Sequence, residues 1–150
     1  MENFLIRRAV VSEQRELEGL QMRASLTNAG DRDALLAHSD AIELPPEQIA
    51  AGSVFVAERN GAIAGFAALL PRADGGAELD ALFVEPTMRR CGIGRRLVEH
   101  CCGVARLQGS AFLHVVGNPH AQDFYVACGF QLTGAAETRF GPGLLMRRIV

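Results

Sequence analysis

Apolar and polar residues follow two different periods along the chain, one typical of β-strands and the other typical of helices. Short alternating or continuous apolar runs predict strands, whereas apolar residues three to four positions apart predict helices. The expected strands are 4–10, 54–59, 62–70, 77–84, 111–116, 131–139 and 144–149. The expected helices are 13–26, 31–38, 46–52, 93–108 and 120–128.

Turn and cap residues mark where these elements end. Ser12 is expected to cap the first long helix, because its hydroxyl can accept a hydrogen bond from a free N–H group there. The dipeptide Asn60-Gly61 predicts a type I′ hairpin between the second and third strands. Gly141-Pro142-Gly143 is expected to connect the last two strands.

The order of the elements indicates the fold class. Strand, helix and strand over 77–116 predict a right-handed crossover, which makes the two strands parallel. Together with the hairpins, this arrangement predicts an α/β fold with a mixed sheet flanked by helices. A chain of 150 residues suits a single domain over 1–150 with one core.

Composition excludes several classes of function. The formal net charge of -2 gives no basis for binding nucleic acid or a membrane surface. No apolar run reaches the ~18 residues of a membrane span. The first residues lack the pattern of a signal peptide, so a cytoplasmic protein is expected. The four cysteines lack metal-binding spacing, and the absence of lysine excludes a P-loop.

The strongest functional signal lies between the fourth strand and the long helix that follows it. The strand ends at Val84-Glu85-Pro86, because proline cannot donate to a sheet ladder. Arg89, Gly92 and Gly94 follow, around the start of the helix. Free N–H groups and the positive end of a helix dipole meet at such a point, and they bind anions such as phosphate.

Two motifs in this half of the chain form a family signature. The loop reads Arg89-x-x-Gly92-x-Gly94, and the stretch from Asn118 to Phe130 reads N-x-x-A-x-x-F-Y-x-x-x-G-F. Both resemble motifs of the GNAT superfamily of N-acetyltransferases, in the family's order and separation. The resemblance is strong over 53–150 and weak over the first fifty residues. It implies a GNAT-type mixed central sheet of about six or seven strands flanked by about four helices.

The resemblance also implies acetyl-CoA as the acetyl donor, with no metal. Backbone groups of Leu82, Phe83 and Val84 would hold the pantetheine arm in the manner of an added strand. Asn118 would bond to that arm, to the nearby backbone, or cap the following helix. Tyr125, the only tyrosine, matches the family residue that protonates the coenzyme A thiolate; an aromatic anchor is the structural alternative. The residues implied to hold the pyrophosphate are Arg89, Arg90, Cys91, Gly92, Ile93, Gly94 and Arg95.

Three side chains are candidates for the general base that deprotonates the amine. Glu78 lies eleven residues before Arg89, a spacing at which some members of the family carry an activating glutamate. His114 lies in the strand before Asn118, and imidazole titrates near neutrality. Asp80 shares a strand face with Glu78. Reaction without a single protein base is the fourth alternative.

Residues and resemblance together predict an acetyl-CoA-dependent N-acetyltransferase that acts by direct attack in a ternary complex. The acceptor would be a primary amine of a small molecule or peptide. A non-catalytic acyl-CoA-binding sensor or regulatory module of the same fold is the alternative, and a nucleotide-binding α/β domain is a weaker one. The expected partners include neither nucleic acid nor membrane, and a homodimer is the assembly that the family implies. The acceptor itself is not predicted, because 27–52, which would form its wall, resembles the family least.

Overall fold

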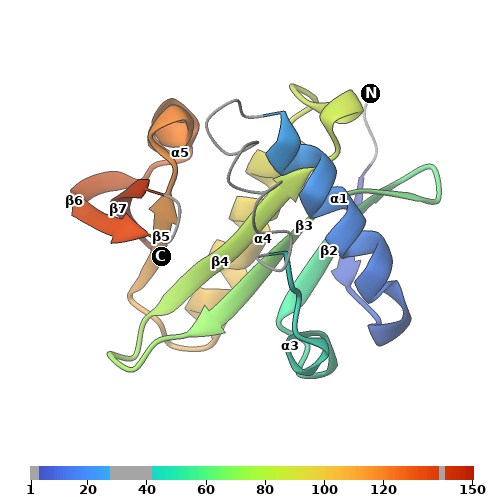
Figure 1. Ribbon diagram of the computed structural model, residues 1–150. Coiled ribbons are helices and arrows are strands. Elements are labelled where there is room, and N and C mark those ends of the chain that lie inside the picture. The colour runs from blue at the N-terminus through green and yellow to red at the C-terminus, as the bar shows by residue number, and fades with distance from the viewer. Residues whose placement is uncertain (1–3, 28–41, 139–140) are drawn as a thin grey trace. The chain divides into compact units, whose positions relative to one another are not determined.

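A seven-stranded mixed sheet forms the framework of the protein. The computed structural model describes residues 4–27, 42–138 and 141–150. The strands are β1 Leu5–Arg8, β2 Val54–Arg59, β3 Ala62–Pro71, β4 Ala77–Val84, β5 Phe112–Gly117, β6 Gln131–Thr138 and β7 Gly141–Ile149. Their order in the sheet is β1-β2-β3-β4-β5-β7-β6 (Figure 1). β4 and β5 are parallel, whereas β5–β7 and β6–β7 are antiparallel.

Four α-helices and three short 3-10 helices complete the described part of the chain. The α-helices are α1 Gln14–Leu26, α3 Pro46–Ala50, α4 Ile93–Leu107 and α5 Gln122–Ala127. The 3-10 helices are η1 Val11–Glu13, η3 Pro86–Met88 and η4 Pro119–Ala121. No helix of the described residues reaches the length and hydropathy that crossing a bilayer requires.

The sequence predicted the type of each long element within the described ranges. The strands over 54–59 and 77–84 have their predicted bounds, and the parallel pairing of β4 with β5 is confirmed. Asn60 and Gly61 have φ angles of 52° and 80°, as a type I′ turn requires, so the predicted hairpin is also confirmed. The helix predicted over 31–38 lies outside the described residues.

Several predicted boundaries differ from the structure: the strand predicted over 4–10 is Leu5–Arg8, and the helix predicted over 46–52 ends at Ala50. Two further differences concern the kind of structure. Gly141-Pro142-Gly143 is not a connection, because β7 begins at Gly141 and these residues pair with the end of β6. The helix predicted over 120–128 starts as the 3-10 helix η4, and α5 begins only at Gln122. Both differences lie beside a proline, which lacks a backbone N–H group. Proline therefore interrupts the sequence pattern of a strand or helix at that position, although the element itself continues.

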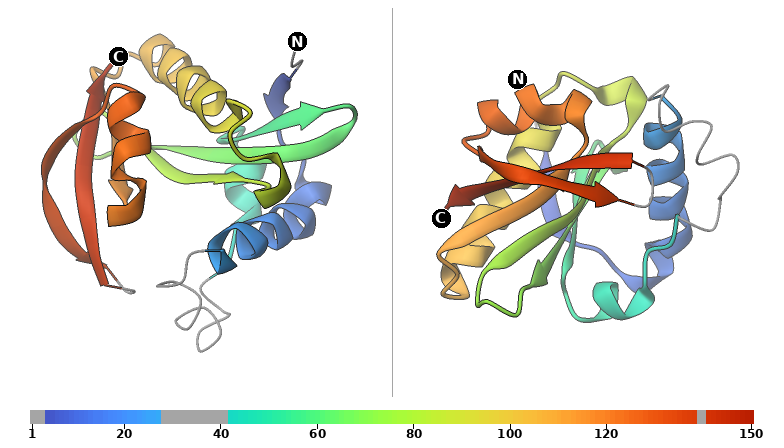
Figure 2. Two further views of the ribbon diagram at one scale, coloured as in Figure 1. Left: turned by 90° about the horizontal axis from the view of Figure 1, so that it is seen from above. Right: turned by 60° about the vertical axis from the view of Figure 1, so that its left-hand side comes forward.

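The chain forms two compact units, which are described separately: Met1–Ala68 with Ala81–Leu97, and Leu69–Asp80 with Val98–Val150. In the first unit, α1 and α3 lie on one face of β2 and β3, and α4 starts on the other face (Figure 2). The buried cluster beneath α1 and α3 is entirely apolar and consists of Ala9, Leu17, Leu20, Leu44, Ile49, Val54, Val56, Phe66 and Ala68.

Gly65 allows the start of α4 to approach β3 closely. A Cβ atom at this position would lie 2.9 Å from the carbonyl oxygen of Phe83 and 3.1 Å from Ile93. It would also lie 3.3 Å from Leu97. Any larger residue would therefore push the N-terminus of α4 away from the sheet, or displace the backbone of β4.

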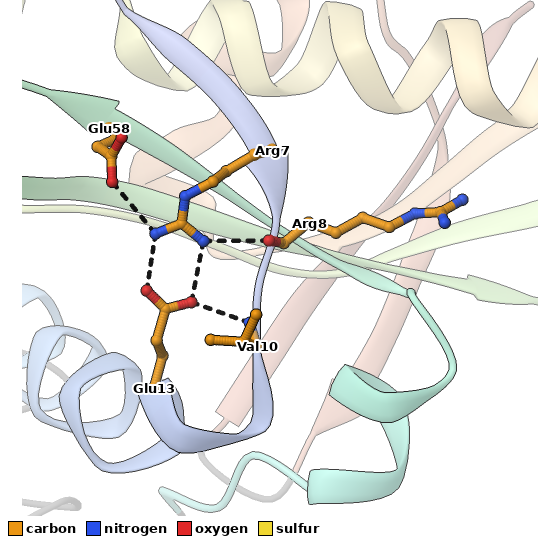
Figure 3. Close-up of polar contacts among 5 residues, drawn as sticks. All are labelled: Arg7, Arg8, Val10, Glu13 and Glu58. Carbon is orange, nitrogen blue, oxygen red and sulfur yellow. Dashed lines mark hydrogen bonds and ion pairs between the residues drawn. The ribbon is translucent and has the colours of Figure 1, made fainter. Parts of the chain in front are cut away.

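An ion-pair cluster fixes the entry to α1 in the first unit (Figure 3). Arg7 donates to both carboxylate oxygens of Glu13, at 3.0 and 2.7 Å, and to Glu58 at 3.2 Å. The N–H of Val10 donates to Glu13 at 2.9 Å. The predicted cap at Ser12 is wrong, because Ser12 lies inside η1 and the cap position of α1 is Glu13, which makes no side-chain cap hydrogen bond. The Glu13 carboxylate accepts from Val10 at the start of η1 instead.

The second unit has helices on one face of β5 and β7. Arg148 of β7 donates to Glu99 of α4 at 2.7 Å and to the carbonyl of Cys128, after α5, at 2.8 Å. Side chains of successive strand residues point to opposite faces, so Arg147 lies on the other face. Cys101, Cys102 and Cys128 are buried free thiols, as expected for small apolar residues.

Candidate active site

The loop between β4 and α4 has the backbone geometry of an anion site. Arg90 and Gly92 adopt left-handed conformations, with φ angles of 65° and 81°. A Cβ atom at Gly92 would meet nothing within 4 Å, so the space in front of the loop is open. α4 begins at Ile93, and the first N–H groups of a helix have no partner within it. The loop therefore presents free donors and the positive end of the helix dipole to open space.

The arginines of this loop differ in what they contact. Arg89 donates to the hydroxyl of Thr27 at 2.6 Å and to the carbonyl of Ala24 at 3.2 Å, at the end of α1. Arg90 and Arg95 are exposed, and within the described part of the chain they form no hydrogen bond or ion pair. No acidic residue lies in the first turn of α4. Unpaired cations beside a positive helix end are unfavourable unless an anion binds.

Cys91 lies within this loop but is not buried among apolar residues. Its thiol donates to the carbonyl of Arg89 at 3.7 Å, and Arg59 of β2 donates to its sulfur at 3.9 Å. The next two predicted residues, Ile93 and Gly94, form the first turn of α4, and Ile93 is fully buried. The buried side chain of Ile93 thus fixes the start of α4 against the core, and its backbone lies at the helix N-terminus that faces the loop.

β4 and β5 pair over only part of their lengths. Among the described residues of the second unit, their register ends at the pair Leu79–Val115, although β5 continues to Gly117. In the first unit, Leu82–Val84 is half-buried, and the N–H of Glu85 donates to Ala64 of β3 at 2.8 Å. The end of β5 therefore has ladder groups on its β4 side without a partner in its own unit.

Tyr125 is buried between two phenylalanine rings and a glycine. Its ring meets Phe124 and Phe130 in T-shaped contacts, with centroids 5.2 and 5.5 Å apart. A Cβ atom at Gly117 would lie 3.1 Å from the Tyr125 ring, so only glycine leaves room for it on β5. Burial raises the pKa of Tyr125 to about 12, which keeps its hydroxyl protonated at neutral pH. The ring is an anchor, and its hydroxyl is a potential proton donor.

Asn118 follows β5 directly and is exposed. It occupies the cap position of η4 in an extended conformation, but its side chain makes no cap hydrogen bond. The cap role that the sequence left open is therefore wrong. The amide group has no other partner within the described residues.

The structure brings two candidate bases together on one face of the second unit. Glu78 and His114 are a register pair across β4 and β5, and both line a pocket of about 350 Å³. Arg72 donates to Glu78 at 3.2 Å and to Asp74 at 3.1 Å. Burial, and secondarily the charge of Arg72, lowers the pKa of His114, so its imidazole is neutral at physiological pH. Asp80 does not line this pocket, and burial raises its pKa.

Sequence reasoning missed two arginines of this pocket. Arg72 could have been found, because the turn signal Asp74-Gly75-Gly76 returns the chain so that Gly76 pairs with Arg72, whose side chain then reaches Glu78. Arg147 had no local signal, because its place beside His114 depends on the β5–β7 register. Among the described residues, no group of three His, Cys, Asp or Glu side chains could hold a metal ion.

Comparison with known proteins identifies the class to which this fold and loop belong. The Acetyltransferase (GNAT) family model matches residues 21–130, and the chain is therefore a member of that family. A curated relative, the peptidyl-lysine N-acetyltransferase YjaB of Escherichia coli (strain K12), is 40% identical over 62 residues. This match covers 41% of this chain and 41% of the relative. The corresponding protein of Salmonella typhimurium matches with the same identity and coverage.

Solved structures show the same fold. The PaiA N-acetyltransferase from Thermoplasma acidophilum, in complex with coenzyme A, superimposes with a TM-score of 0.79 at 16% identity over 99% of both chains. YncA from Salmonella typhimurium, with acetyl-CoA, gives a TM-score of 0.71 at 24% identity, covering 98% of this chain and 94% of YncA. The predicted GNAT-type architecture is thus confirmed.

Proposed function

We propose that this chain is an acetyl-CoA-dependent N-acetyltransferase, a single catalytic domain over 1–150 that transfers acetyl to a primary amine. The observation that carries the proposal is the loop before α4, where left-handed Arg90 and Gly92 precede a helix N-terminus without acidic residues. Such a loop suits the pyrophosphate of coenzyme A. Membership of the acetyltransferase family supports the same ligand.

Different residues have different roles in the proposed reaction. Backbone groups of Leu82–Val84 and the amide of Asn118 hold the pantetheine arm. Glu78 or His114 accepts the proton that the amine loses as its nitrogen bonds to the acetyl carbon. Tyr125 gives its proton to the departing sulfur as the carbon–sulfur bond breaks, and bulk water restores that proton. The raised pKa of Tyr125 supports this direction of transfer, because the phenol is protonated before the reaction.

The acceptor class to test first is the side-chain amine of lysine. The relative YjaB is named a peptidyl-lysine N-acetyltransferase, and the match to it covers less than half of each chain. A small amine is the other acceptor that the same chemistry allows. This chain contains no lysine, so any acetyl-lysine formed in an assay comes from the added acceptor.

Thiol release from acetyl-CoA with a panel of lysine peptides and small amines tests the proposal. A thermal shift with coenzyme A, measured beside it, reports binding without turnover. Thiol release that depends on an added amine supports the proposed acetyltransferase activity. Stabilisation without release from any amine indicates a sensor module, and the absence of both contradicts the proposed site.

A further inference from the structure

Three charged or titratable side chains stand in a row on the face of the second unit opposite α5. Glu78 of β4 pairs with His114 of β5, and His114 pairs with Arg147 of β7. Paired residues of neighbouring strands point to the same face, so the three side chains lie next to one another. They line one pocket of about 350 Å³ together with Arg72, Val115, Val116, Thr133, Leu145 and Met146.

The two arginines of this pocket differ in their contacts. Arg72 donates hydrogen bonds to both Asp74 and Glu78. Burial is the main cause that lowers the pKa of His114, whereas the charges of Arg72 and Arg147 are opposed by those of Asp74 and Glu78. Within the described part of the chain, Arg147 contacts no carboxylate. Arg147 is therefore an arginine of the pocket wall whose guanidinium has no carboxylate partner among the described residues.

Arg147 is also positioned by an aromatic ring. Its guanidinium carbon lies 4.3 Å from the centroid of Phe112, the strand neighbour of His114 on the same face. This cation–π contact restrains the side chain. Within the described part of the chain the guanidinium makes no hydrogen bond, and two of its N–H groups match the two oxygens of a carboxylate.

We propose that Arg147 is a specificity-determining residue that selects amine acceptors carrying a carboxylate. This inference rests on the proposed acetyltransferase function. Neighbouring strands are about 4.8 Å apart, so Glu78 and Arg147 are separated by two strand spacings, roughly 10 Å. An acceptor that spans the row places its amine at Glu78 and His114 and its carboxylate at Arg147. Lysine offers this spacing through its own carboxylate or through an acidic neighbour in a peptide.

Two matched substrate pairs test whether the carboxylate belongs to lysine itself or to an acidic neighbour in a peptide. Nα-acetyl-lysine is compared with its uncharged carboxamide, and a lysine peptide with an adjacent aspartate is compared with its asparagine counterpart. The wild-type protein should prefer the charged member of at least one pair by about five- to tenfold in kcat/KM, mainly through KM. A charged hydrogen bond, partly weakened by solvent, has this size.

Three variants assign the preference to one side chain. Arg147→Gln should abolish the preference, and Arg147→Lys should keep part of it, because lysine retains the charge without the two-pronged geometry. Arg106→Gln removes the same charge from an exposed position on α4 that does not line the pocket, and it should leave the preference unchanged. Melting curves confirm that the variants are folded.

A binding experiment keeps this inference distinct from the proposed function. Chemical-shift titration of the isotope-labelled protein with each substrate pair, without acetyl-CoA, measures the same preference in the absence of turnover. A carboxylate preference in binding that is lost in Arg147→Gln supports the inference even if no amine is acetylated. Turnover with equal preference in the wild type and Arg147→Gln, or no preference in either assay, overturns it.

Discussion

At the scale of single residues, Tyr125 combines an anchoring ring with a protonated hydroxyl. Tyr125→Phe should keep the T-shaped packing and reduce kcat by about 10²-fold, the low end of the range for a general acid, because a thiolate is a fair leaving group unaided. Affinity for coenzyme A should change little, since the hydrogen bond strengthens only as the sulfur gains charge. Steady-state kinetics beside a melting curve measure both. Full kcat in a folded variant would make the tyrosine purely structural.

Glu13 should make the stability of the first unit depend on pH. Hydrogen bonds from Arg7, and to a lesser extent from Val10, hold the pKa of Glu13 below its ordinary value despite partial burial. Its folded pKa lies below its unfolded pKa, so its stabilisation is complete above about pH 5 and is lost as the pH falls through the folded value. Glu13→Gln should cost about 1 kcal/mol at pH 7 and progressively less towards pH 3.

Chemical denaturation at several pH values measures the difference in unfolding free energy between the wild type and Glu13→Gln, which should become smaller as the pH falls. Glu16→Gln is the matched control, because it removes an exposed carboxylate from α1 that makes no side-chain hydrogen bond within the described part of the chain. A deficit in Glu13→Gln that stays constant from pH 7 to 3 would show that the contacts of Figure 3 act through packing alone.

At the scale of elements, a substitution in the loop between β4 and α4 should weaken coenzyme A binding more than it affects folding. Gly92→Asp places a carboxylate where phosphate oxygens are proposed to lie, and like charges repel at that distance. Any residue with a side chain at φ 81° is also strained. Gly61→Asp carries a comparable backbone strain at φ 80°, also in open space, but lies in the β2–β3 hairpin.

Calorimetry with coenzyme A compares the two variants. Gly92→Asp should weaken binding at least tenfold, and Gly61→Asp should leave it unchanged while lowering the melting temperature by a similar amount. Equal affinity in both folded variants would remove the loop from the coenzyme A site.

The sequence predicted elements better than contacts between them. The apolar period identified α4, and Asn60-Gly61 identified its hairpin, because both signals are local. The glycines and the helix that follows predicted an anion-binding loop, but they did not predict the left-handed conformation of Arg90, since arginine has no preference for it. The row that ends in Arg147 could not be predicted, because strand register is decided by packing between distant segments.

At the scale of the whole molecule, the pH–rate profile depends on the ionisation of the proton donor, the general base and the acceptor amine. Burial raises the pKa of Tyr125 to about 12, so the donor should cause no loss of rate up to about pH 10. An amine acceptor with a pKa near ~10 is mostly protonated at neutral pH, and there a base is needed. Glu78→Gln should therefore lower the rate mainly below the pKa of the acceptor, and high pH should rescue it.

Two further variants decide between the candidate bases. His114→Gln should be the variant with the pH-dependent loss if the imidazole is the base, since its lowered pKa keeps it neutral and able to accept a proton. Asp74→Asn is the control for Glu78→Gln, because it removes the other carboxylate from Arg72 without touching the pocket lining. If Glu78→Gln, His114→Gln and Asp80→Asn all keep the wild-type profile, no single candidate base acts. The free amine would then be selected from solution, and the rate would follow its concentration alone.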